Sequence, residues 1–497
     1  MQIARQSVRF GPKFAMNRQI RQLGVALVLL FSALFVQLNY LQVLRADDLA
    51  NATGNTRNAV RDFSRARGTI ESADGAVLAR SVPTDGAFER RREYPEGDLF
   101  GPVTGYLSFT FGTDGVERTY NADLAGRRAP VGDLRDLLSD RDRTGNLVLT
   151  MSKSLQQVAR DALGDRRGAV VALNPADGAI LALWSFPSFD PNPLAAHNQQ
   201  AVQTTWNALQ ADPAKPLLPR TYRERYAPGS TFKVVTAAAA LERAPELATR
   251  EYPTLRALDL PQTNRDLPNY GGGACGGMLP SLLARSCNTG FGQMGLDLGA
   301  QSLAAEARDF GFGSRPPFDL PAAATSVFPG ASSFDRDLPS LAQSAIGQRD
   351  VTATPLQMAL VAAGIANGGV IMKPHVMAEV RDDDGAVVRR YRPEPWREAM
   401  RAPAAAALRD LMVGVVTGGT ATRAAIPGVT VAAKTGTAQT VGDNAHAWLV
   451  AFAPAEAPRI AVAVIVESQP GLGDTQTGGK VAAPIAQAVM KAALGTP

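Results

Sequence analysis

Apolar residues first dominate a stretch close to the N-terminus, from Leu23 to Leu44, whose only polar members are Ser32, Gln37, Asn39, Tyr40 and Gln42. At a rise of 1.5 Å per residue, about 22 helical residues span roughly 33 Å, enough to cross the hydrocarbon core of a bilayer. This run is longer than the apolar part of a signal peptide, and no small-x-small cleavage site follows closely. Residues 23–44 are therefore predicted to form one uncleaved transmembrane anchor.

The residues that precede this run are basic and set its orientation: Arg5, Arg9, Lys13, Arg18 and Arg21. Positively charged flanks stay on the cytoplasmic side of a membrane. We therefore expect residues 1–22 to be a cytoplasmic tail and everything after the anchor to lie outside the cytoplasm.

The next segment, residues 45–151, alternates polar and apolar positions and is interrupted by Gly, Pro and Asp. Thr69-Ile70 and Ala76-Val77-Leu78 flank Asp74-Gly75, a pattern typical of a β-hairpin. The basic cluster Arg90-Arg91-Arg92 lies between two glutamates and indicates a solvated edge or loop. The pattern predicts a small β-rich module over residues 45–151.

Residues 152–497 show the pattern of a larger α+β domain. An amphipathic helix is predicted over Leu155–Leu163, an apolar central helix after Lys233, and a closing helix over Ala482–Leu494. Apolar runs of strand length predict five strands: Ala169–Leu173, Ala179–Trp184, Val429–Ala433, Ala445–Phe452 and Ile460–Glu467.

Composition narrows the function. The 497 residues are 45% hydrophobic and 20% charged, with a net charge of +5, which is typical of a globular chain. The basic residues are not interleaved with aromatic residues as on a nucleic-acid surface. His197, His375 and His446 lie far apart and form no recognised zinc spacing with the two cysteines. No metal, cofactor or nucleic acid is implied.

The first candidate chemistry is Ser230-Thr231-Phe232-Lys233, which follows Ala227-Pro228-Gly229 and leads into the apolar helix. A serine and a lysine three residues apart share one face of a helix. Serine needs an adjacent base to become a nucleophile, and a buried lysine with a lowered pKa can serve as one. The helix N-terminus also favours a developing negative charge.

Two further motifs follow in the order that this chemistry requires. Ser286-Cys287-Asn288 supplies a hydroxyl and a carboxamide, and Lys434-Thr435-Gly436-Thr437 ends the predicted strand Val429–Ala433. Each motif alone is a weak indication, since a turn, a cap or a strand end would have the same composition. Their order along one domain is a strong one.

The SxxK, SxN and KTG set resembles the penicillin-binding proteins and the serine β-lactamases. Longer matches are similar to class B penicillin-binding proteins: Arg67-Gly68-Thr69-Ile70, Val171–Pro175, Ser188–Asn192, Ile346-Gly347-Gln348, Thr354–Ala359 and Ala366–Gly369. Asn269-Tyr270-Gly271-Gly272, followed by Cys275, and the cysteine within the SxN motif resemble the penicillin-binding protein A group.

The resemblance implies a fold and a reaction. The fold would be an antiparallel five-stranded sheet with helices on both faces over residues 152–497, with residues 45–151 as a pedestal. The reaction would be D,D-transpeptidation of peptidoglycan stem peptides ending in D-Ala-D-Ala, which β-lactams inhibit. Because residues 45–151 are too few for a glycosyltransferase module, the resemblance also implies a separate membrane polymerase of the shape, elongation, division and sporulation family.

The resemblance also assigns roles to residues. Ser230 would attack the substrate carbonyl, Lys233 would accept its proton, and Ser286 would relay a proton to the leaving amine. Asn288 would hydrogen-bond the substrate and steady Lys233. The backbone N–H groups of Ser230 and Thr437 would form the oxyanion hole. Lys434, Thr435 and Thr437 would bind the substrate carboxylate, and Gly436 would leave room for the substrate backbone.

Cys275 and Cys287 lie twelve residues apart, and the glycines at 271–273 allow the chain to double back. A disulfide is permitted outside the cytoplasm. We expect a Cys275–Cys287 bridge, with two free buried thiols as the alternative.

Two other functions remain open. A hydrolase, either a D,D-carboxypeptidase or a β-lactamase, would pass the acyl group to water. The glutamates between Asn288 and Lys434 do not lie in the Glu-x-x-Leu-Asn setting of class A β-lactamases. A non-catalytic, β-lactam-binding wall scaffold is the second alternative, and the intact motifs argue against it.

Overall fold

The computed structural model describes residues 15–45, 63–85, 88–126, 144–439, 445–468 and 477–496. The chain divides into two units, Met1–Arg61 and Asp62–Pro497. In the first unit, α1 (Ala15–Asn39) continues into the π-helical turn η1 (Tyr40–Leu44). Residues Arg18–Val43 are long and apolar enough to cross a membrane, as predicted. The basic residues Arg5, Arg9 and Lys13 lie outside the described residues.

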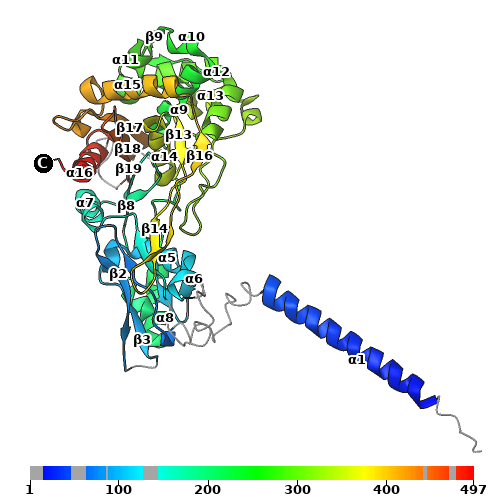
Figure 1. The fold of residues 1–497 in the computed structure, drawn as a ribbon. Coiled ribbons are helices and arrows are strands. Elements are labelled where there is room, and N and C mark those ends of the chain that lie inside the picture. The colour runs from blue at the N-terminus through cyan, green and yellow to red at the C-terminus, as the bar shows by residue number, and fades with distance from the viewer. Residues whose placement is uncertain are drawn as a thin grey trace, which may run out of the picture. The chain divides into compact units, whose positions relative to one another are not determined.

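A five-stranded antiparallel sheet forms the centre of the second unit (Figure 1). Its order is β17 (Ala432–Gln439), β18 (Ala445–Ala453), β19 (Ile460–Val466), β7 (Gly168–Leu173) and β8 (Ile180–Phe186). Every residue of β7 and β19 is buried, because a central strand covered on both faces is apolar throughout. The predicted five-stranded sheet is confirmed.

Helices cover both faces of this sheet. On one face α7 (Lys153–Leu163) and α16 (Ala482–Leu494) pack against each other and against β8 and β19. On the other face α14 (Pro355–Ala366) packs on β7, β18 and β19. Almost every residue of α14 is buried, as expected for a helix that is apolar all round.

A helical region lies beyond the β17 edge and carries most of the candidate site. Its helices are η5 (Gly229–Phe232), α9 (Lys233–Arg243), α10 (Pro245–Ala248), η6 (Tyr270–Gly272), α11 (Leu279–Arg285), α12 (Asn288–Asp309), η7 (Ala331–Phe334), α13 (Leu338–Ser344), α15 (Ala402–Gly418) and η8 (Thr422–Ala424). Its short strands are β9 (Tyr252–Leu255), β10 (Ala257–Leu258), β11 (Leu267–Pro268) and β12 (Cys275–Gly277). A separate pair, β13 (Val370–Met372) and β16 (Pro395–Glu398), packs beside α14 through β13.

The N-terminal module is built around a six-stranded sheet. Its order is β15 (Val387–Arg390), β14 (Met377–Arg381), β6 (Asn146–Leu149), β1 (Ile70–Glu71), β2 (Val77–Pro83) and β3 (Arg90–Glu93). The predicted hairpin around Asp74-Gly75 is confirmed as β1–β2. The strands β14 and β15 come from residues far along the chain, so the yellow β14 lies beside the blue strands in Figure 1.

The rest of this module is more helical than the predicted β-rich segment. It contains η2 (Gly97–Leu99), α4 (Gly101–Thr104), β4 (Leu107–Ser108), β5 (Gly112–Thr113), α5 (Gly115–Thr119) and α6 (Asn121–Leu124). Two further helices, η4 (Asn192–Ala195) and α8 (Gln199–Ala211), follow β8.

The expectation that the arginine cluster is solvated is wrong at one position. Arg92 lies on the edge strand β3 but is buried. Its Nε donates to Glu117 Oε1 at 2.6 Å, while Arg67 Nε donates to Glu117 Oε2 at 2.7 Å. A buried carboxylate needs such partners, and Glu117 lies far enough along the chain that the local pattern does not reveal it.

Candidate active site

Ser230 lies in the short 3₁₀ turn η5, which is followed at once by α9. Side chains three residues apart eclipse each other in a 3₁₀ turn, so Ser230 and Lys233 share one side, as predicted. Gly229 has a φ of +53°, and a Cβ there would lie 2.9 Å from Thr437 O. Glycine therefore permits both the backbone conformation and the close approach of this turn to β17.

The amine of Lys233 is fully buried and held by the SxN motif. Its Nζ donates to Ser286 O at 2.7 Å and to Asn288 Oδ1 at 2.7 Å, and lies 3.3 Å from Ser286 Oγ. Ser230 Oγ makes no hydrogen bond to any residue within the described ranges. The amine of Lys233 is thus positioned by Ser286 and Asn288.

Ser286 sits at the point where α11 ends, with φ +58° and ψ +44°. This left-handed conformation costs a residue with a side chain roughly 1–2 kcal/mol. It directs the carbonyl of Ser286 toward Lys233, while Ser286 Oγ also accepts from Lys434 Nζ at 2.8 Å. One hydroxyl therefore lies between two lysine amines.

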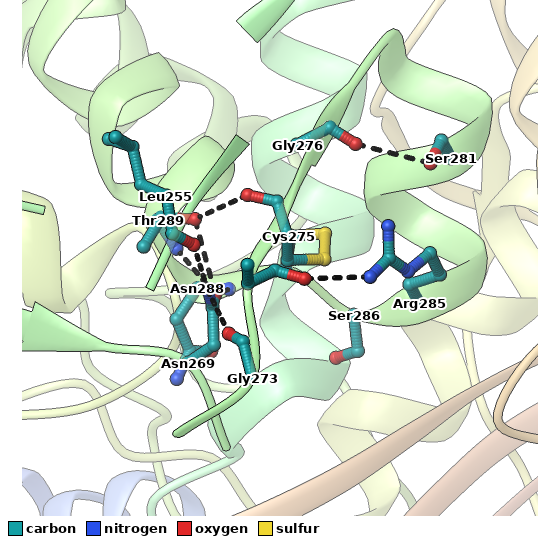
Figure 2. Close-up of a disulfide and its surroundings, with 12 residues drawn as sticks. Leu255, Asn269, Gly273, Cys275, Gly276, Ser281, Arg285, Ser286, Asn288 and Thr289 are labelled. Carbon is teal, nitrogen blue, oxygen red and sulfur yellow. Dashed lines mark hydrogen bonds between the residues drawn. A yellow bond between two sulfur atoms is a disulfide. The ribbon is translucent and has the colours of Figure 1, made fainter. Parts of the chain in front are cut away.

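Asn269 caps the first turn of α12, directly behind the SxN motif (Figure 2). Its Oδ1 accepts from Asn288 N at 2.9 Å and from Thr289 N at 3.1 Å. Its Nδ2 donates to Leu255 O at 2.8 Å and to Gly273 O at 3.0 Å. This role of Asn269 could not be predicted, because no local pattern links the residue to a helix start 19 residues away.

Cys275 and Cys287 form a disulfide with a Cα–Cα distance of 5.6 Å. The bridge ties β12 to the residue immediately before α12, and Arg285 Nη2 donates to Ala274 O at 2.8 Å beside it (Figure 2). The disulfide and this hydrogen bond therefore also hold the SxN motif in position.

The KTG motif lies inside β17 rather than at the end of a strand over Val429–Ala433, so that boundary was wrong. β17 begins at Ala432 and continues to Gln439, with Lys434 opposite Val450 and Thr437 opposite Ala447. The alternation is hidden in the sequence because Lys434 is a buried charged residue that ordinary patterning places outside.

Gly436 lies where other parts of the protein approach β17 closely. A Cβ at Gly436 would lie 2.9 Å from Pro228 O, Thr231 Cγ2 and Trp448 Cβ. Glycine is required because the turn carrying Ser230 packs against β17 at this residue. Thr435 Oγ1, by contrast, shares a hydrogen bond of 2.6 Å with Thr420 Oγ1, another residue that the sequence did not single out.

These elements surround a cavity of about 1100 Å³. Ser230, Ser286, Asn288, Thr435 and Thr437 line it, while the amines of Lys233 and Lys434 lie buried beneath. Burial, and then the charge of Lys434, hold the pKa of Lys233 well below its usual value. Burial lowers the pKa of Lys434 to about 7. A lysine amine with a lowered pKa, of the kind that can accept a proton, thus lies 3.3 Å from the hydroxyl of Ser286.

The described part of the chain contains no group of three His, Cys, Asp or Glu side chains placed so that they could hold a metal ion.

Comparisons with known proteins place this site in a family. Residues 168–491 match the penicillin binding protein transpeptidase domain, and residues 67–148 match the penicillin binding protein A dimerisation domain. The peptidoglycan D,D-transpeptidase PbpA of Mycolicibacterium smegmatis is 42% identical over 96% of this chain and 99% of its own length. The chain belongs to the class B penicillin-binding proteins.

Solved structures of such penicillin-binding proteins agree with this fold. The ceftriaxone acyl-enzyme of penicillin-binding protein A from Mycobacterium tuberculosis is 40% identical, covers 88% of this chain and all of that chain, and has a TM-score of 0.80. A D,D-transpeptidase domain from Eggerthella lenta is 35% identical, with 87% and 99% coverage and a TM-score of 0.76. The resemblance to the A group is shown as well.

Proposed function

We propose that this class B penicillin-binding protein cross-links peptidoglycan stem peptides through an acyl-enzyme on Ser230. The observation that supports this most strongly is the convergence of the Lys233 amine on Ser286 and Asn288, beneath the cavity into which Ser230 opens. A neutral buried amine next to a nucleophilic hydroxyl is the requirement of serine acyl transfer without histidine.

Acylation uses Ser230 and Lys233. Ser230 Oγ attacks the carbonyl carbon between the two D-alanines while Lys233 Nζ accepts the hydroxyl proton. Ser286 Oγ, which lies within reach of both amines, passes a proton to the departing amine as the C–N bond breaks, and D-alanine leaves. Backbone N–H groups of Ser230 and Thr437 receive the oxyanion, and one such donor contributes on the order of 3 kcal/mol.

The β17 edge binds the donor peptide. Thr435 and Thr437 line the cavity, so their hydroxyls donate to the terminal carboxylate, and Lys434 beneath them supplies positive charge while protonated. The outer edge of β17, the end strand of its sheet, accepts the substrate backbone as an added strand. The role of Gly436 is to let this strand approach the Ser230 turn.

A second stem peptide completes the reaction. Its amine attacks the Ser230 ester, the C–Oγ bond breaks, and Ser230 recovers its proton as the new amide forms. No glutamate lines the cavity among the described residues, so the residue type that a class A β-lactamase uses as its deacylating base is absent from that lining.

The membrane arrangement and the partner are also part of this proposal. Residues 1–22 would be cytoplasmic, 23–44 the anchor, 45–151 the pedestal, and 152–497 the extracytoplasmic transpeptidase domain. The basic residues before the apolar helix support this orientation. A separate membrane polymerase of the shape, elongation, division and sporulation family would supply the glycan, since family matches cover a dimerisation module and a transpeptidase domain.

Incubation of the full chain with a peptide ending in D-Ala-D-Ala, with and without an amine-bearing stem peptide, tests the function. Mass spectrometry that finds the peptide–peptide amide supports cross-linking. Release of D-alanine to water alone, even at high acceptor concentration, would make the chain a carboxypeptidase. Acylation with no D-alanine turnover would make it a β-lactam-binding scaffold.

A further inference from the structure

A free carboxylate lines the catalytic cavity. Asp266 is exposed, immediately precedes β11, and lies on the cavity wall. Within the described ranges it forms no hydrogen bond or ion pair. The other charged side chains that line the cavity in the described part of the chain are all basic: Arg285, Arg349, Arg423 and Lys480. A cation that enters this cavity therefore meets a single negative charge there.

Asp266 is held on the wall that carries the SxN motif. Two residues further on, Pro268 O accepts from Asn288 Nδ2 at 2.9 Å, and Asn269 caps the helix that Asn288 begins. Leu267 pairs with Leu258 across β10 and β11, which fixes the backbone next to the carboxylate. The backbone that directly follows Asp266 is thus tied to Asn288 and to β10.

This wall is where the acceptor amine must approach. By microscopic reversibility, the attacking amine enters along the path by which the D-alanine amine leaves. Ser286 transfers the proton on that path. Free alkylamines are ammonium ions at neutral pH, because their pKa is about 10.4. The basic residues of the lining repel such an ion, so an anion on the cavity wall favours its entry.

We propose that Asp266 recognises the ammonium group of the acceptor stem peptide and thereby favours amide formation over hydrolysis. This rests on the proposed transpeptidase function. The amine binds as an ammonium ion, gives one proton to solvent, and attacks the ester carbonyl as a neutral nucleophile. Its second proton returns to Ser230 Oγ as the C–Oγ bond breaks. Asp266 is a positioning residue that takes no proton in this sequence.

The test compares Asp266→Asn with Asp259→Asn in the full chain. Asp259 is an exposed aspartate of the same segment that does not line the cavity. The donor is a diacetylated Lys-D-Ala-D-Ala peptide. The acceptors are a stem tripeptide with a free lysine amine and hydroxylamine, which is uncharged at neutral pH. The readouts are the acceptor concentration that gives equal aminolysis and hydrolysis, and the rate of penicillin acylation.

For the lysine acceptor, Asp266→Asn raises the acceptor concentration that gives equal aminolysis and hydrolysis. The expected rise is about two- to fivefold, which is the effect of one exposed charge pair. Hydroxylamine partitioning and penicillin acylation stay at wild-type values, Asp266→Glu restores the lysine acceptor, and Asp259→Asn changes nothing. The role of Asp266 is overturned if Asp266→Asn and Asp259→Asn behave alike. It is also overturned if Asp266→Asn weakens the use of both acceptors equally or slows penicillin acylation. Wild-type protein that forms no amide with either acceptor overturns the transpeptidase function itself, and this role with it.

Discussion

Replacement of Asn269 by alanine tests how the SxN motif is positioned. The side chain is 7% exposed and makes five hydrogen bonds of 3.2 Å or less, three of them accepted from Asn288 and Thr289. Gly273 is exposed and its carbonyl can be hydrated, so the main loss is the cap on two backbone N–H groups. A lost N-cap costs about 1 kcal/mol, and buried donors left unsatisfied cost about 1–3 kcal/mol each.

We expect Asn269→Ala to lower the free energy of unfolding by about 3 kcal/mol, which for a chain of this size lowers the melting temperature by on the order of 5 °C. Because Asn288 orients Lys233, penicillin acylation slows by roughly ten- to a hundredfold. Thermal unfolding and fluorescent-penicillin kinetics measure the two effects. Asn264→Ala, an exposed asparagine of the same segment, is the control. An Asn269→Ala protein with wild-type acylation would refute the positioning of Lys233 through this cap.

Three further predictions follow from the buried charges and the disulfide. Lys434→Gln removes the charge that lowers the pKa of Lys233, so the rise of acylation rate with pH moves to higher pH; an unchanged or lower midpoint contradicts this. Cys275→Ser lowers the unfolding free energy by about 3 kcal/mol, and a reductant destabilises only the wild type; equal sensitivity of both proteins argues against the bridge. Arg92→Ala costs about 3–5 kcal/mol, because it leaves a buried carboxylate short of a partner, whereas the exposed Arg91→Ala stays within about 0.5 kcal/mol. Equal losses of stability in Arg92→Ala and Arg91→Ala, measured by calorimetry, would contradict the buried ion pairs of Glu117.

Much of the fold could be predicted because the central sheet is buried on both faces. Strands β7, β8, β18 and β19 are apolar runs that local patterning detects. The predicted boundary of β17 was wrong because the buried Lys434 and its polar neighbours interrupt the apolar run. These residues belong to the candidate site, where local sequence rules are often broken. The edge strand β15 was missed because its residues are mostly exposed and alternate weakly. Its partner β14 was missed because Glu379 and Arg381 interrupt the apolar pattern of a short strand.

The site could be predicted only as far as its motifs are local. Ser230 and Lys233 are one turn apart, so spacing alone places them together. The bond from Asn269 to the start of α12 and the left-handed turn at Ser286 depend on residues brought together by tertiary structure. Neither leaves a periodic pattern in the sequence, and both determine where Asn288 and Lys233 lie.

The central claim is that Ser230 is the residue that becomes acylated. The most direct measurement is mass spectrometry of the full chain and of Ser230→Ala after incubation with penicillin, followed by proteolysis to locate the adduct. We predict one penicilloyl group on the peptide that contains Ser230, and none on the variant. An adduct of equal yield in Ser230→Ala, or one carried by another residue in the wild type, would contradict the account.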